Sequence, residues 1–137
     1  MKMILSSSDF LNEKSKNKIL KNLGIALENC RVLFIPNEKA NQEKISSGKY
    51  NKRLEETGFS KENIYVFNEN QINKFINLDI DLIYVGGGNT FSTLKKIRKC
   101  NFDKEIIKYM NKGVCYLGGS AGAHIMTKNI KHVLYFE

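Results

Sequence analysis

The sequence predicts an α/β fold, with one domain built on a doubly wound, mostly parallel sheet. Short, continuously apolar runs alternate along the 137 residues with longer polar segments of helical period. Continuous apolar runs are typical of parallel strands that helices cover on both faces. No internal repeat or linker divides this alternation, so residues 1–137 are expected to form a single domain. In such a sheet the functional loops lie at the carboxyl ends of the strands.

Strand predictions come from runs rich in β-branched and aromatic residues, which fit a pleated, buried surface. In chain order these runs are Met3–Ser7, Arg31–Pro36, Ile64–Asn68, Asp81–Val85 and Val114–Leu117. The segments between them carry apolar residues three and four positions apart, which predicts helices. The expected helices cover about Asn12–Leu23, Asn41–Thr57, Thr90–Lys99 and Asp103–Asn111.

Three local signals bear on the ends of these helices. Gly48 weakens the helix predicted over Asn41–Thr57, because glycine costs about 1 kcal/mol in a helix interior. Asp103 is expected to cap the first amides of the last helix. Gly113 follows the basic end of that helix and is expected to adopt the left-handed conformation.

Composition and charge exclude several classes of protein. With 42% hydrophobic and 26% charged residues and one proline, the chain is typical of a soluble globular protein rather than a disordered one. No apolar run approaches the ~20 residues that cross a bilayer, and the first residues lack a secretory signal, so we expect a cytoplasmic protein without a membrane partner. The net charge of +8 is spread over both halves and does not predict a nucleic-acid partner.

The cysteines and histidines do not predict a metal site. Cys30, Cys100 and Cys115 are odd in number and widely spaced, which favours reduced thiols over a disulfide framework or a zinc site. Cys115 stands inside an apolar run and is expected to be buried. His124 and His132 are the only imidazoles and have no carboxylate cluster nearby. We therefore expect neither a metal nor a cofactor.

The first glycine loop, Gly86-Gly87-Gly88-Asn89-Thr90, follows a predicted strand and precedes a predicted helix. Its glycines permit a sharp turn, a close approach to the backbone and amide donors above the sheet. The loop fails as a dinucleotide fingerprint, because Phe91 stands where the third glycine is needed, and the P-loop lysine is absent. A nucleotide-binding module is therefore disfavoured, while a plain tight turn stays an alternative.

The second loop, Gly118-Gly119-Ser120-Ala121-Gly122, is a G-x-S-x-G pattern between a predicted strand and an apparent helix over Ala121–Thr127. This context is the one that a nucleophile elbow requires. Glycines flank the serine there because the turn is crowded, and the hydroxyl is held at the positive end of the following helix. The alternative is a turn of small residues with an idle serine.

Together, the segment from Asp81 to Phe91 and the run Gly119-Ser120-Ala121-Gly122-Ala123 resemble the peptidase E family. This family comprises aspartyl dipeptidases and the related cyanophycinases, which are serine hydrolases on a class I glutamine-amidotransferase-like, flavodoxin-like fold. The resemblance runs from the first strand to about Ile130. Amidotransferases on this fold carry a cysteine at the elbow, so Ser120 favours the peptidase branch.

The resemblance implies a serine-type peptidase that acts on short peptides. Ser120 would attack an amide carbonyl and form an acyl-enzyme that water hydrolyses. The amides of Gly88 and Ala121 would stabilise the oxyanion. The implied substrates are peptides with an amino-terminal aspartate, or aspartate-rich polymers.

The base and its acidic partner are not evident. Family members supply a histidine and an acid from segments beyond the elbow helix, where this chain has only Thr127 to Glu137. His124, His132 and Glu137 are the candidates, each with a purely structural role as its alternative. We therefore expect a domain that lacks its C-terminal part. The alternative function is a catalytically silent remnant that binds a ligand or associates with itself.

The apolar segment Val133-Leu134-Tyr135-Phe136 bears on that alternative. If the sheet ends after Val114–Leu117, this segment has little of its own domain to pack against. It is then expected to support a homodimer, through an isologous contact or a swapped strand. Alternatively, it folds back as an edge strand.

Overall fold

The computed structural model shows a six-stranded sheet in which every strand pair is parallel. It describes the whole chain except residues 1, 7–12, 38, 87–89, 119–132 and 137. The strands are β1 (Lys2–Ser6), β2 (Val32–Ile35), β3 (Ile64–Val66), β4 (Leu82–Val85), β5 (Cys115–Gly118) and β6 (Val133–Phe136), in the order β3-β2-β4-β5-β1-β6. Counted from β2, the strands β2 to β5 lie in the order 2-1-3-4, which begins the flavodoxin-like arrangement.

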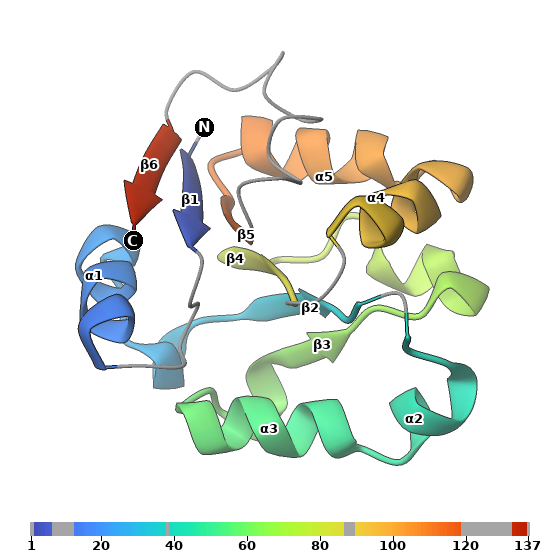
Figure 1. Cartoon of the computed structure of the whole chain (residues 1–137), viewed down its shortest axis with the longest axis horizontal. Helices are drawn as coiled ribbons and strands as arrows, with labels where there is room; N and C mark the ends of the chain where they lie inside the picture. The colour runs from blue at the N-terminus through green and yellow to red at the C-terminus, as the bar shows by residue number, and fades with distance from the viewer. Residues whose placement is uncertain (1, 7–12, 38, 87–89, 119–132, 137) are drawn as a thin grey trace.

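Helices cover both faces of this sheet, as the alternation of strands and helices predicted (Figure 1). They are α1 (Glu13–Leu23), α2 (Gln42–Ser46), α3 (Lys49–Thr57), α4 (Thr90–Lys99) and α5 (Phe102–Asn111), with short 3-10 helices η1 (Leu27–Asn29), η2 (Lys61–Asn63) and η3 (Glu69–Phe75). Residues of α4 and α5 pack in one buried cluster with one face of the sheet, and residues of α1 and α3 pack with the other face. The predicted doubly wound α/β fold is thereby confirmed.

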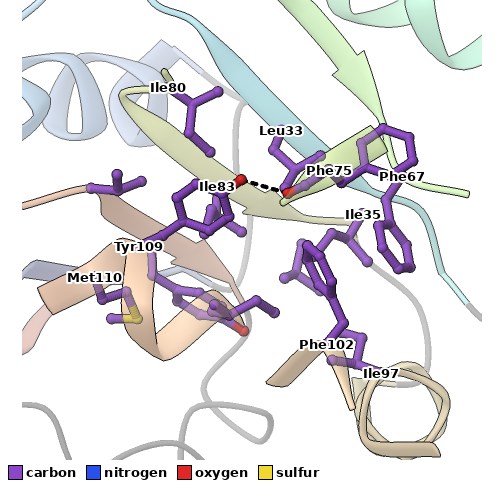
Figure 2. Close-up of a cluster of buried hydrophobic side chains, with 14 of the residues drawn as sticks. Leu33, Ile35, Phe67, Phe75, Ile80, Ile83, Ile97, Phe102, Tyr109 and Met110 are labelled. Atoms are coloured by element: carbon purple, nitrogen blue, oxygen red, sulfur yellow. Dashed lines mark hydrogen bonds between the residues drawn. The ribbon is translucent and has the colours of Figure 1, made fainter. Parts of the chain in front are cut away.

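The core under α4 and α5 holds the segment that leads into β4 (Figure 2). The Tyr109 hydroxyl, on α5, donates to the carbonyl of Phe75 and accepts from the amide of Leu78 at 2.8 Å. Burial raises the pKa of this hydroxyl. One buried phenol therefore ties α5 to the connection between η3 and β4.

Two predicted details of the helices are wrong. The helix expected over Asn41–Thr57 is broken into α2 and α3, because Gly48 takes a left-handed φ of 78° before α3 begins. Asp103 does not cap α5: Asn101 precedes the helix with φ 61°, and Asp103 lies within the first turn. An earlier start places the fully buried Phe102 in the core, while the Asp103 charge still faces the positive end of the helix dipole. Gly113 has the expected positive φ, 100°.

The sequence leaves two arrangements open for the apolar segment Val133–Phe136, and the structure decides between them. Val133–Phe136 form β6, which pairs with β1 in the register Met3↔Val133 to Ser6↔Phe136. The segment thus adopts the alternative of an edge strand. Its pairing with β1 satisfies backbone groups that β1 would otherwise expose.

Candidate active site

The two glycine loops leave the sheet from neighbouring strands. β4 and β5 pair in parallel, in the register Leu82↔Cys115 to Tyr84↔Leu117. Gly86 directly follows β4 and Gly118 is the last residue of β5, so both stand at the carboxyl edge of the sheet. Adjacent strands lie about 4.8 Å apart, which brings the starts of the two loops close together.

The residues to which the sequence assigns chemistry follow these points in the chain. The predicted nucleophile, the oxyanion donors and the candidate base and acid lie outside the described residues: Gly88, Ser120, Ala121, His124, His132 and Glu137. Their roles stay predictions. The structure does describe the strand ends from which the two loops start, the packing around Gly86 and Gly118, and the opposite edge of the sheet.

Gly86 and Gly118 are glycines for reasons of space. Neither has the positive φ found at Gly24, Gly48, Gly58 and Gly113. A Cβ atom on Gly86 would lie 2.9 Å from Cζ of Phe34, and one on Gly118 would lie 2.8 Å from Cε1 and Oη of Tyr116. A side chain at either glycine would therefore collide with an aromatic ring.

A polar network continues the carboxyl edge beyond β3. The buried Asn68 donates from Nδ2 to Oε1 of Gln42 at 2.7 Å and accepts at Oδ1 from the amide of Asn70 at 3.0 Å. Gln42 donates in turn to Oγ of Ser46 at 3.0 Å. These bonds fix α2 against the end of β3. Sequence reasoning missed this role because the partners are 26 residues apart.

Cys115 is in the wrong place to replace Ser120 as a nucleophile. It begins β5 and is 4% exposed, three residues and roughly 10 Å before Gly118 at about 3.3 Å per residue. Burial, followed by the nearby Asp81 and Cys115, raises the pKa of the buried Cys30 to about 12. None of the three cysteines, all of which the structure describes, forms a disulfide, and Cys30 and Cys115 are buried.

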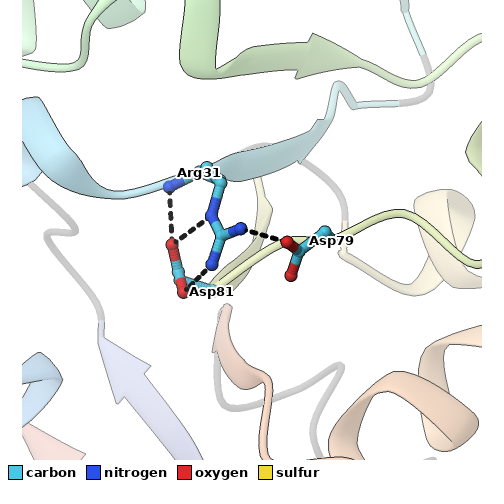
Figure 3. A network of polar contacts seen from close by, with 3 residues as sticks. All are labelled: Arg31, Asp79 and Asp81. Carbon is cyan, nitrogen blue, oxygen red and sulfur yellow. Dashed lines mark hydrogen bonds and ion pairs between the residues drawn. The ribbon is translucent and has the colours of Figure 1, made fainter.

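The amino edge of the sheet carries the strongest charge cluster of the described residues (Figure 3). Asp81 accepts from Arg31 at three points: the backbone amide at 2.9 Å, Nε at 3.0 Å and Nη2 at 2.9 Å. The remaining guanidinium nitrogen, Nη1, forms an ion pair with Asp79. The hydrogen bonds from Arg31 hold the pKa of Asp81 below its ordinary value.

An open cavity of about 420 Å³ lies beside this cluster and is also lined by Lys112 and Gly113. These residues precede β2, β4 and β5, so the cavity lies at the end of the sheet opposite the glycine loops. Within the described part of the chain, no group of three or more His, Cys, Asp or Glu residues could hold a metal ion. Of the helices that the structure describes, none is long and apolar enough to cross a membrane.

Comparison with known proteins gives a consistent result. Residues 3–136 match the family model of peptidase family S51. An uncharacterized peptidase of Listeria monocytogenes is 34% identical over 112 residues, covering 78% of this chain and 53% of the relative. Peptidase E of Haemophilus influenzae is 42% identical over 60 residues, covering 40% of this chain and 28% of that protein.

A solved structure agrees with these matches. A crystal structure named as a peptidase E protein from Listeria monocytogenes EGD-e superposes with a TM-score of 0.61 at 28% identity. The superposition covers 90% of this chain and 60% of that one. The chain spans about half the length of the curated relatives that it matches.

Proposed function

Because the chain belongs to peptidase family S51, we propose that it is a serine-type peptidase with Ser120 as the nucleophile. The observation that carries the proposal is the pairing of β4 with β5. That pairing starts the G-G-G-N-T loop and the G-G-S-A-G loop side by side at the edge where parallel sheets bind their substrates. A nucleophile on one loop and an oxyanion donor on the other then serve the same carbonyl group.

In the proposed reaction, the Ser120 hydroxyl attacks the scissile carbonyl and its proton passes to a base. The amides of Gly88 and Ala121 donate to the oxyanion, and one such donor contributes about 2.7–4 kcal/mol to lowering the barrier. The amine leaves with a proton, and water hydrolyses the acyl-enzyme. His124 is the candidate base on the elbow segment, and Glu137 and His132 are the other candidates.

The proposed substrates are short peptides with an amino-terminal aspartate, with aspartate-rich polymers as the alternative. The family resemblance supports this class, and the net charge of +8 favours an acidic substrate. The decisive assay compares an aspartyl dipeptide with a neutral dipeptide of similar size. Equal rates of hydrolysis would remove the aspartyl assignment and leave the peptidase assignment intact.

A fluorophosphonate probe, which reacts only with an activated serine, tests the nucleophile directly. The native chain should be labelled, and Ser120→Ala should abolish labelling. Ser60→Ala is the matched control, because Ser60 lies at the amino edge and donates to the carbonyl of Glu28 at 2.7 Å. Cys115→Ala should also keep labelling. A folded native chain without labelling would favour the silent module that binds a ligand or associates with itself.

A further inference from the structure

Two aromatic rings occupy the space beside Gly86 and Gly118, the residues from which the two glycine loops start. We propose that Phe34 and Tyr116 are positioning residues: each ring fills the space of a missing side chain and holds in place the glycine from which its loop starts. The proposal rests on the proposed function, in which Ser120 and the Gly88 amide act on one carbonyl group.

The first contact lies within β5. Tyr116 and Gly118 are two residues apart on one strand and therefore face the same side of the sheet. The Tyr116 ring is fully buried, and its Cε1, Oη and Cζ atoms lie 2.8, 2.8 and 3.0 Å from the position of a Cβ on Gly118. A methyl group at Gly118 would therefore displace either the ring or the strand end that leads to Ser120.

The second contact crosses from β2 to β4. Phe34 pairs with Tyr84, so Gly86 lies diagonally from Phe34 on the same face. The Phe34 ring packs edge-on against Tyr84, with centroids 5.1 Å apart, and lies tilted against Tyr50, with centroids 5.8 Å apart. The Gly86 amide donates to the carbonyl of Ile35 at 2.9 Å. The Phe34 ring and the Gly86 backbone are both held in place, so there is no room between them for a methyl group on residue 86.

The two rings lie on opposite faces of the sheet. Tyr116 belongs to the buried cluster with α5, and Phe34 belongs to the cluster with α3. Neither glycine has a left-handed φ, so alanine fits the backbone at both positions and only the rings oppose it. Tyr116 with Gly118 and Phe34 with Gly86 therefore form two matched pairs. Together they fix the positions of the ends of β4 and β5 relative to each other.

A double-substitution cycle tests this pairing by the rate of fluorophosphonate labelling. Gly118→Ala should lower the rate about 100-fold, since a displacement near 1 Å can cost that much. Adding Tyr116→Leu removes the three closest atoms and should restore at least about a tenth of the native rate. Gly86→Ala with Phe34→Leu is the second, independent cycle. All rates are measured well below the melting temperature of each variant.

The controls use the same substitutions at the amino edge. Gly113→Ala strains a φ of 100° in open space at the start of β5, and Phe59→Leu removes part of a buried ring before β3. Both should lower the melting temperature and leave the labelling rate unchanged. As positioning residues, Phe34 and Tyr116 should lower the labelling rate about tenfold when either is changed alone to leucine. A merely structural role predicts that Phe34→Leu and Tyr116→Leu leave the rate unchanged, as these controls do.

Two results would overturn the proposal: native labelling by Gly118→Ala, or a double variant that reacts no faster than Gly118→Ala alone. If the native chain is not labelled, the proposed function fails, and amide chemical shifts of residues 86–90 and 118–122 decide the positioning role instead. Tyr116→Leu should then shift these signals more than Phe59→Leu does. Equal shifts in the Tyr116→Leu and Phe59→Leu variants would contradict the positioning role.

Discussion

The two ends of the sheet are built differently. At the amino edge, Arg31 and Asp81 join the starts of β2 and β4 through three hydrogen bonds, and Ser60 and Asn63 both donate to the carbonyl of Glu28. At the carboxyl edge, Gly86 follows β4 and Gly118 ends β5, and an aromatic ring fills the space that a side chain at either glycine would need. Side-chain hydrogen bonds also hold α2 at the carboxyl edge beyond β3, but the residues at the ends of β4 and β5, Gly86 and Gly118, have no side chains.

This difference suggests that the amino edge contributes to stability and that the carboxyl edge serves the proposed reaction. Side chains at the amino edge satisfy one another, so their loss should change the free energy of unfolding and leave the reaction unaffected. Glycines at the carboxyl edge give little stability, but in the proposed reaction they would let a substrate carbonyl approach the backbone. Substitutions at the two ends should therefore give opposite patterns of effect on stability and on labelling.

The largest expected effect is on the labelling rate, and it distinguishes the residues that flank the two ends of β6. Val133 begins this strand beside Met3 at the amino edge, and Phe136 ends it beside Ser6 at the carboxyl edge. Glu137 follows Phe136 in the chain, so we propose Glu137 rather than His132 as the acidic or basic partner of Ser120. Glu137→Gln should lower the labelling rate about 100-fold, as expected for an acid–base group, and His132→Ala should leave it unchanged. The reverse result would assign the role to His132.

A smaller effect is expected from Tyr109→Phe, and it concerns stability alone. The change leaves the buried carbonyl of Phe75 without its donor and the partly buried amide of Leu78 without its acceptor. An unsatisfied buried group costs about 1–3 kcal/mol, so urea denaturation should show a free energy of unfolding lower by that amount. Ile106→Val, in the same core, should cost about 0.5–1.5 kcal/mol. Slower labelling by Tyr109→Phe would show that the two ends are coupled.

The Arg31–Asp81 pair should show a weaker effect that depends on pH, since both side chains are partly open to solvent. Hydrogen bonds from Arg31 lower the folded pKa of Asp81 below its ordinary value of 3.8. Their stabilisation is therefore complete above pH 3.8 and is lost as the pH falls through the lowered folded pKa. Asp81→Asn should be less stable than the native chain at neutral pH, and the difference should shrink in acid. A difference independent of pH would contradict this account.

The sequence predicted the parts of the fold that depend on local pattern. The strands that became β2 and β4 were found because their apolar runs are continuous, and the two glycine loops were found because they follow such runs. The edge strand β6 was only an alternative, since its pairing with β1 joins residues 130 positions apart, from Met3 to Val133. Local pattern carries no signal for that contact.

The supports of the candidate site escaped sequence reasoning for the same reason. Phe34 reaches Gly86 only through the register between β2 and β4, which the order of residues does not reveal. Arg31 and Asp81 are 50 residues apart, and each looks like an ordinary charge at the start of a strand. The Tyr116–Gly118 contact, within one strand, is the exception: an aromatic residue two positions before a glycine was a usable signal.

The last prediction concerns self-association, which should affect the reaction least. We propose that two copies of the chain associate through the outer edge of β6. The described sheet ends at β6, and no described strand lies beyond it. Two copies could pair these edges about a two-fold axis, which would bring the apolar segment Val133–Phe136 against its own equivalent. Sedimentation should therefore show a dimer, and Tyr135→Lys should weaken it, because a charge on an edge strand opposes pairing. Deletion of residues 132–137 is a poorer test, since it uncovers β1 as a new apolar edge. A native chain that sediments as a monomer at all concentrations would exclude the dimer. It would not affect the difference between the amino and carboxyl edges of the sheet.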